Sequence, residues 1–309
     1  MSPATTPSRE QLDDLLSPQA KQTLAHLDFV ARKTVQGLRH GAHRSKRRGV
    51  STEFDHHKQY MAGDPIKHID WKASARHDRY FVKRYVEDSA MTVRVILDRS
   101  GSMAQATGEG PTKYLQAARF AACICYLAIA QRDMAALAMT AADGTRWLQG
   151  GSTDAHLVRI LIELASAEPV ERDEVNSCIR AVADRGERRG AVVFISDLMY
   201  DPEPTQRELA RISAQGHEMI VCQLKDPTEE QFPFNRWVQF GDLEDRSVKH
   251  RVDAMVLREI YLEQYQALVE GWRTWAKRHD ATMLSLSTEQ SMHEALSNYM
   301  AARAGTGGG

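Results

Sequence analysis

The sequence predicts an α/β protein with a doubly wound, mostly parallel central sheet that carries helices on both faces. Two apolar runs of strand length, residues 92–97 and 191–196, lead directly into the aspartates Asp98 and Asp197. Strand-like and helix-like segments alternate through most of the remaining chain, which is the order that builds a parallel sheet. With 42% hydrophobic residues among 309, the chain has enough material for a large buried core.

Charge and composition limit the classes of molecule that the protein binds and its location in the cell. The formal net charge is -1 at pH 7, so bulk electrostatics indicate neither nucleic acid nor an anionic membrane as a partner. No apolar segment reaches membrane-spanning length, and the first residues lack the apolar stretch of a signal peptide, so we expect a cytoplasmic protein without a membrane span. The 4 cysteines lie in apolar helix-like or strand-like patterns and are predicted to be reduced core residues.

The chain is predicted to have four parts: a disordered N-terminus (1–16), an N-terminal helix and extension (17–90), the α/β domain (91–303) and a flexible tail (304–309). Within the extension, residues 39–49 form a short basic run. Such a run suits either a phosphate contact or a solvated loop that meets an acidic partner, and the near-neutral chain favours the second interpretation.

Apolar periodicity places the first elements of the domain. The helix 154–166 is expected to be capped by Ser152 or Thr153. Residues Ala142-Asp143-Gly144 mark a hairpin turn. The predicted elements are strands 81–87 and 92–97, a long helix 113–131, hairpin strands 135–140 and 145–148, and helices 154–166 and 175–183.

The second half continues the alternation and ends in two helices. Gly216 is a helix stop signal, and an aromatic stripe along the helix 255–278 is predicted to be core rather than a ligand site. The predicted elements are strand 191–197, helix 204–215, strand 217–224, a hairpin of 237–243 and 247–252, helix 255–278, strand 281–286 and helix 291–302.

Oxygen-bearing side chains gather after the first of the two apolar strands. Asp98, Ser100 and Ser102 follow one another at i, i+2 and i+4 on a short loop. Parallel strands place ligand sites at their carboxyl ends, so Asp197 is expected at the same edge. Carboxylate and hydroxyl oxygens suit a hard divalent cation, Mg²⁺ or else Mn²⁺. The alternative is that Asp98 and Ser100 only cap a turn and the following helix.

These residues resemble the metal-ion-dependent adhesion site of von Willebrand factor A domains, in which Asp-x-Ser-x-Ser on one strand is joined by an Asp on a later strand. An upstream block also resembles the bacterial domain-of-unknown-function 58 family. That block comprises Gly49, Glu53-Phe54, Tyr60, Gly63-Asp64, Ile69-Asp70-Trp71 and Ser74-Ala75-Arg76. Within it, Gly63 forms a turn and Trp71 is part of the motif, and we interpret Asp64, Asp70 and Arg76 as a polar network that supports the block. A catalytic carboxylate pair there is the weaker alternative.

The resemblance also implies a metal-binding Thr before the helix 175–183. This sequence has Asp173 or Glu174 at that place. An acidic residue there, Asp173 in the first instance, would hold the cation directly or through water, and Thr153 is an alternative. These possibilities stay open.

Function is predicted to be binding rather than catalysis. A cation held by Asp98, Ser100, Ser102 and Asp197 would keep one coordination position open for a carboxylate of a partner protein. The family resemblance implies a MoxR-type AAA+ ATPase as that partner, in a chaperone-like or complex-maturation system. One alternative is a metal-dependent hydrolase with Asp173, Glu174 or Asp201 as the base. The other is a scaffold that holds no metal.

Overall fold

The computed structural model describes residues 53–61, 69–74, 79–86, 90–108, 110–141, 144–170, 175–234, 237–241 and 249–306. The described residues fall into two compact units, a smaller one within residues 53–90 and a larger one within residues 91–306. Several predictions lie outside the described residues: the helix beginning at 17, the basic run 39–49, Gly63, Asp64, Arg76, Asp173 and Glu174.

The smaller unit contains an antiparallel pair, β1 (Glu53–Gln59) and β2 (Phe81–Val86), with the short helix α3 (Trp71–Ser74) between them in sequence. Asp70 accepts a hydrogen bond from the backbone N–H of Ala73 at 3.0 Å, which caps α3. Trp71 is 62% exposed and contacts the ring of Tyr80 edge to face. Asp70 and Trp71 therefore shape a local helix in this unit.

The larger unit is built on a six-stranded sheet in the order β10-β7-β6-β3-β4-β5. All neighbouring strands are parallel except β4 and β5, which form the predicted antiparallel hairpin at one edge. The strands are β3 (Thr92–Leu97), β4 (Met134–Ala141), β5 (Gly144–Gly151), β6 (Ala191–Ser196), β7 (Glu218–Lys225) and β10 (Thr282–Ser287). The predicted α/β fold with a mostly parallel sheet is confirmed.

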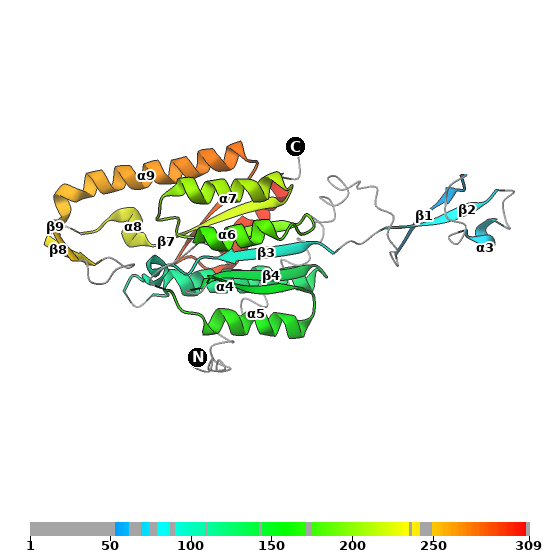
Figure 1. Ribbon diagram of the computed structural model, residues 1–309, viewed down its shortest axis with the longest axis horizontal. Helices are drawn as coiled ribbons and strands as arrows, with labels where there is room; N and C mark the ends of the chain where they lie inside the picture. The colour runs from blue at the N-terminus through cyan, green and yellow to red at the C-terminus, as the bar shows by residue number, and fades with distance from the viewer. Residues whose placement is uncertain are drawn as a thin grey trace. The chain divides into compact units, whose positions relative to one another are not determined.

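Among the described residues, helices cover both faces of this sheet (Figure 1). One face packs against α4 (Lys113–Ala130), α5 (Asp154–Ser166) and α10 (Met292–Thr306), and the other against α6 (Val175–Asp184), α7 (Pro202–Ala214) and α9 (Ala254–Arg278). The remaining elements are the 3-10 turn η2 (Gly101–Ala104), the short helix α8 (Pro227–Gln231) and the hairpin of β8 (Trp237–Gly241) and β9 (Lys249–Asp253).

Strand β3 shows why the sheet is buried on both faces. Val95 and Leu97 pack into the core under α4, while Ile96 points into the core under α6, α7 and α9. Arg94 is buried at the amino end of the strand, where its guanidinium pairs with Glu187 at 2.7 Å. The arginine in an otherwise apolar strand is therefore compensated by a specific partner.

Helix boundaries follow local capping residues. Thr153 accepts a hydrogen bond from the N–H of His156 and begins α5 at the predicted residue. Asp201 caps α7 and Pro202 occupies its first turn, so this helix begins two residues before the predicted 204. Helix α10 continues to Thr306, into the segment predicted to be a flexible tail.

The cysteines are free thiols in the core, as predicted. Cys123, Cys125, Cys178 and Cys222 are all fully buried. Burial raises the pKa of Cys123, Cys125 and Cys222 to about 12. Among the described residues, no helix combines the length and the apolar character that crossing a bilayer requires.

Candidate functional site

The carboxyl ends of β3 and β6 form the candidate site, which we call the carboxyl edge. From the central β3 the chain passes outward to β4 and β5 on one side, and later returns to β6 on the other. This change of direction is where open α/β sheets place ligand sites. Asp98 follows β3 and Asp197 follows β6, and the N–H of Asp98 donates to the carbonyl of Ile195 at 3.0 Å.

The Asp-x-Ser-x-Ser loop converges on Asp98. One carboxylate oxygen of Asp98 accepts from the N–H of Ser100 at 2.8 Å, and the other accepts from the hydroxyl of Ser196 at 2.5 Å. The hydroxyls of Ser100 and Ser102 lie 3.0 Å apart. Asp98 is completely buried, whereas Ser102 is partly exposed. The loop thus buries its carboxylate and presents a hydroxyl to solvent.

A strained turn after β6 completes this part of the site. Leu198 is fully buried and has a φ of 61°, which is unusual for a branched residue and costs conformational energy. Its N–H donates to Ser196 Oγ at 2.9 Å, and the N–H of Met199 donates to Asp197 Oδ1 at 3.2 Å. Ser196 Oγ also lies 3.0 Å from the hydroxyl of Tyr200. Side-chain hydrogen bonds therefore hold the turn in a conformation that the backbone alone would not favour.

The centre of the carboxyl edge is a buried ammonium between two carboxylates. Lys113 Nζ lies 2.5 Å from Asp197 Oδ2 and 2.6 Å from Glu229 Oε1. The side chains of Lys113 and Asp197 are fully buried, and that of Glu229 is 8% exposed. We call these three residues the lysine trio. Buried charges are costly unless they are paired, so the members of this trio depend on one another.

Lys113 occupies a position that local rules do not favour. It is the first residue of α4, after the N-cap Thr112, and a cation at a helix N-terminus is opposed by the helix dipole. Its N–H donates to the carbonyl of Gln105 at 2.8 Å, which ties α4 to the loop after η2. The pairing with two carboxylates outweighs the local penalty, and such a conflict between local preference and structure is typical of functional sites.

The pKa values of the trio follow from burial and charge. Burial alone would lower the pKa of the Lys113 ammonium, but the charges and hydrogen bonds of Asp197 and Glu229 outweigh it, so the pKa is raised. Burial raises the pKa of Glu229 and the charge of Asp197 adds to the rise, while Lys113 opposes it. Lys113 is therefore held as a cation within this site.

A capping box in α8 brings Glu229 to the lysine. Asp226 accepts from the N–H of Thr228, and Glu229 Oε2 accepts from the N–H of Asp226 at 3.1 Å. The hydroxyls of Thr107 and Thr288 also donate to Asp226. Burial alone would raise the pKa of Asp226, but the hydrogen bonds from these threonines hold it below its ordinary value.

The contacts at Asp197 do not fit a divalent cation. Lys113 already supplies the positive charge that Asp197 needs, and an ammonium and a metal ion on one carboxylate repel each other. Within the described ranges, no three His, Cys, Asp or Glu side chains form a group that would hold a metal. The metal hypothesis also requires that Asp98, Ser100 and Ser102 lie close together, and they do. The structure therefore departs from the predicted metal site only at Asp197 and its neighbours.

Three members of this site were not predicted from the sequence: Lys113, Ser196 and Glu229. The position of Lys113 was a usable signal, because it begins a mostly apolar helix and its charge opposes the helix dipole there. The sequence Asp226-Pro227-Thr228-Glu229 was a signal for a capped helix. Asp201, a candidate base, caps α7 by accepting from the N–H of Glu203.

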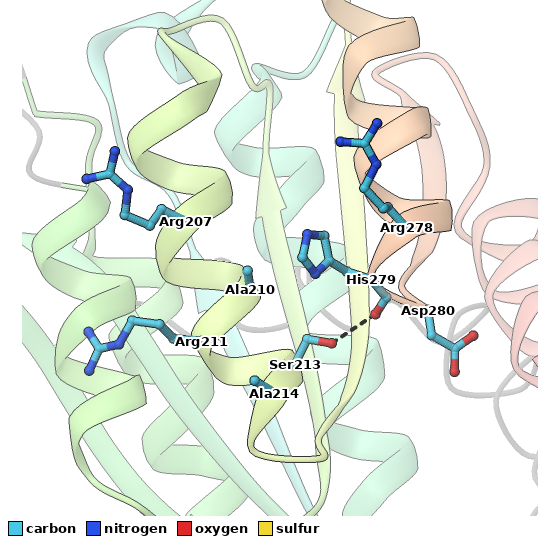
Figure 2. A pocket seen from close by; sticks show the side chains of 8 residues that line it. All are labelled: Arg207, Ala210, Arg211, Ser213, Ala214, Arg278, His279 and Asp280. Atoms are coloured by element: carbon cyan, nitrogen blue, oxygen red, sulfur yellow. Dashed lines mark hydrogen bonds between the residues drawn. The ribbon is translucent and has the colours of Figure 1, made fainter.

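Two hollows lie at opposite ends of the sheet. One, of about 540 Å³, lies where α7 and α9 end and β7 and β10 begin (Figure 2), and we call it the amino-edge hollow. Its Arg211 is already paired with Glu208 and Asp184, and its Arg207 with Glu203. The other hollow, of about 250 Å³, adjoins the turn after β6 and is named the tyrosine hollow. It is lined by Met199, Tyr200, Tyr261, Gln264, Tyr265 and Leu268.

Comparison with known proteins identifies relatives along most of the chain. The family described as "Protein of unknown function DUF58" matches residues 56–269. An uncharacterized protein of Mycobacterium tuberculosis and one of Mycobacterium bovis are each 24% identical over 292 residues, which cover 94% of this chain and 92% of the relative.

Solved structures with similar chain paths are more remote. The protein BatB from Bacteroides thetaiotaomicron has a TM-score of 0.46 and 16% identity, with 70% of this chain and 100% of that chain covered. An aerotolerance-related membrane protein from Bacteroides fragilis has a TM-score of 0.45 and 17% identity, with 70% and 99% covered. The SpRpn10 VWA domain has a TM-score of 0.40 and 10% identity, with 68% and 95% covered.

The lysine trio leads to a prediction about stability. Replacing Lys113 with Met leaves Asp197 and Glu229 buried without their cation, which should lower the free energy of unfolding by about 3–5 kcal/mol. Lys225→Met is the matched control, because the Lys225 side chain is 14% exposed and its partner Glu230 is 41% exposed. Solvent reaches both unpaired groups there, so the loss should be clearly smaller than in Lys113→Met. Urea unfolding of both variants measures the difference, and equal losses would contradict the central role of Lys113.

Asp226 leads to a prediction about pH. Because its folded pKa is lowered, the ionised carboxylate stabilises the fold above the unfolded value of 3.8 and loses this contribution as pH falls through the folded pKa. Asp226→Asn should therefore have a lower free energy of unfolding than the natural protein at pH 7. This difference between the two proteins should become smaller as the pH falls below the ordinary pKa of an aspartate. Thr288→Val lacks one of the hydrogen bonds to Asp226, so its stability should begin to fall at a higher pH than that of the natural protein. Urea unfolding across this range tests both variants, and a gap that is independent of pH would rule out this explanation.

Proposed function

The chain belongs to the DUF58 family of proteins, and we propose that it is a protein-binding module that presents its carboxyl edge to a partner. The observation that carries this proposal is the burial of the charged groups. Asp98, Lys113 and Asp197 have almost no exposed surface, so a substrate has no access to them as catalytic groups. The accessible parts of the edge are the turn η2, with Ser102 and Ala104, and the tyrosine hollow.

We further propose that the positive charge of this site belongs to the chain itself. The sequence predicted a magnesium-dependent site, and that prediction depends on Asp197 as a ligand. Lys113 Nζ at 2.5 Å from Asp197 is the observation that favours a built-in ammonium over a bound metal ion. The loop conformation at the edge is then fixed by contacts within the chain, which suits a surface that is preorganised for binding.

The partner that we propose is a MoxR-type AAA+ ATPase, in a chaperone-like or complex-maturation system. This choice comes from the family resemblance of the upstream block and the Asp-x-Ser-x-Ser loop. Of the three candidate bases of the hydrolase alternative, Asp201 serves as the N-cap of α7, while Asp173 and Glu174 lie outside the described residues. The alternative of a scaffold that holds no metal is compatible with the lysine trio, because Lys113 supplies the positive charge. The binding module that we propose is such a metal-free protein with the added property of binding a partner.

Two exposed alanines provide a matched test of binding at the carboxyl edge. Ala104 ends η2 at this edge, and Ala214 ends α7 at the opposite one. We expect Ala104→Arg to weaken binding to a purified MoxR-type ATPase of the same organism by about tenfold or more, because the added side chain obstructs the contact. Ala214→Arg should change binding by less than about twofold.

The binding test is done by biolayer interferometry at one fixed magnesium concentration, because the ATPase itself requires the ion. Circular dichroism of both variants establishes that they fold. Docking at the carboxyl edge would be refuted if both substitutions weakened binding to the ATPase equally, or if neither substitution weakened it. Absence of binding by the natural protein would remove the ATPase as the partner.

Thermal unfolding of the chain alone tests the built-in charge. With Lys113 in place, we expect EDTA, Mg²⁺ and Mn²⁺ to leave the unfolding temperature unchanged. In Lys113→Ala the vacated carboxylates should bind Mg²⁺ or Mn²⁺, and a ligand at a hundredfold its Kd stabilises the folded state by about 2.7 kcal/mol. A metal-dependent rise in the natural protein that disappears in Asp98→Ala would instead establish the metal site predicted from the sequence.

A further inference from the structure

The first two turns of α9 expose a group of apolar side chains. Met255, Val256 and Ile260 are 67%, 71% and 51% exposed. Among the described residues of the larger unit, the one other large apolar side chain that is exposed is Val158 on α5. Single exposed apolar side chains are ordinary, whereas a group of them in one place marks an interaction surface.

Two carboxylates lie directly beside these apolar residues. Glu259 and Glu263 are exposed, and they continue the row of α9 that begins at Met255, one turn apart. Val256 and Ile260 form the adjacent row. Neither carboxylate forms an ion pair with any side chain that the structure describes. Like charges one turn apart destabilise a helix, so the chain alone gains no stability from this pair. We call these five residues the α9 face.

The flank of these turns is fixed against α8. The guanidinium of Arg258, the one cation among residues 254–264, donates to the carbonyl of Gln231 at 3.2 Å, so its charge is turned toward α8. The rings of Tyr261 and Phe232 lie 4.8 Å apart. Helix α8 carries Glu229 of the lysine trio and lies beside the first turns of α9 (Figure 1). The α9 face is therefore a fixed surface of the fold with negative charge that the described side chains leave unpaired.

The α9 face adjoins the accessible part of the carboxyl edge. The row of Val256 and Ile260 continues to Gln264, which lines the tyrosine hollow. One partner can therefore contact both surfaces. The inference that follows rests on the proposed protein-binding function and specifies the chemistry of the partner's segment.

We propose that the α9 face binds an amphipathic helix of the partner, in which an apolar row lies beside a row of lysines or arginines. Helices repeat their side chains at the same spacing, so the two rows of the partner meet the two rows of the α9 face. Apolar burial stabilises the contact, and the basic row provides selectivity because an acidic helix is repelled. A second copy of this chain fits poorly, since a two-fold pairing brings together Glu259 and Glu263 of both copies.

A designed peptide tests the α9 face without the ATPase. The probe has four repeats of Leu-Lys-Ala-Ala with blocked ends, so that leucines and lysines form adjacent helical rows. One control peptide has glutamate in place of lysine, and the other has serine in place of leucine. We expect the lysine peptide to bind the full chain at submillimolar concentration, and both controls to bind about tenfold more weakly.

NMR of the methionine methyl groups locates the bound peptide. The lysine peptide should shift the methyl signal of Met255, which Met255→Leu identifies, and should leave that of the fully buried Met103 unchanged. Absence of binding by the lysine peptide, equal binding of either control peptide, or an unchanged Met255 signal would overturn the proposal.

A matched pair of charge variants tests the acidic row. Glu259→Gln combined with Glu263→Gln removes both charges of the α9 face, and Glu289→Gln combined with Glu294→Gln removes two exposed charges elsewhere. At low ionic strength we expect the first combination to weaken the lysine peptide about fivefold and the second less than about twofold. Equal weakening would reveal a general effect of charge and refute the site.

A matched pair of apolar variants tests the other row. Ile260→Gln and Val158→Gln each replace an exposed apolar side chain, 51% and 47% exposed, so both should keep the stability of the natural protein. Ile260→Gln should weaken the lysine peptide several-fold, because an apolar contact is lost, and Val158→Gln should not. Unchanged binding in Ile260→Gln would refute the apolar contact.

The outcomes for the α9 face and for the proposed function are distinguishable. Peptide binding at the α9 face together with failure to bind the ATPase would retain the face and remove that partner. ATPase binding that is lost in Ala104→Arg and retained in both α9 variants would retain the module and refute the α9 face. A dimer in sedimentation velocity that Ile260→Gln dissociates would overturn the proposal in favour of a second copy.

Discussion

The ion pairs of Lys113 hold together three segments that are far apart in the chain. Lys113 begins α4, Asp197 follows β6, and Glu229 lies in α8, so one ammonium fixes the relative positions of a helix, a strand end and a short capped helix. None of the three charged groups is stable in the interior alone. The conformation of the carboxyl edge therefore depends on all three being present. The buried ion pairs also fix the conformation of the accessible surface that covers them.

The site has two layers with different tasks. The inner layer contains Asp98 and the lysine trio, which are buried and fix the backbone of two turns. The outer layer contains η2 and the tyrosine hollow, which solvent and partners can reach. Ser196 and Tyr200 connect the layers through hydrogen bonds. Electric fields are screened little in the low-dielectric interior, so the buried charges of the inner layer contribute to the electrostatic potential at the outer layer.

Local features of this fold were predictable from the sequence, and distant pairings were not. The helix 154–166, its cap Thr153 and the two hairpins follow from periodicity and turn residues within a few positions of one another. Asp98, Ser100 and Ser102 were found because their spacing falls within one loop. Lys113 lies 84 positions from Asp197 and 116 from Glu229, and nothing in the local pattern of one residue specifies the others.

The aromatic stripe of α9 illustrates the limit of such patterns in another way. Helical spacing predicted core residues, and Tyr265, Trp272 and Trp275 are indeed buried. Tyr261 and Tyr265 also line a hollow, together with Met199 and Tyr200 of the turn after β6. Periodicity indicates which face of a helix is turned inward, and it contains no information about where the opposing surface ends.

The burial of the four cysteines has a practical consequence for experiments on this protein. A thiol reacts with maleimides as the thiolate, and three of these thiols have a pKa of about 12 as well as no access to solvent. The natural chain therefore needs no cysteine removal before labelling. A single cysteine introduced at an exposed position would accept a fluorophore or spin label selectively, and distances across the carboxyl edge become measurable in the otherwise unaltered protein.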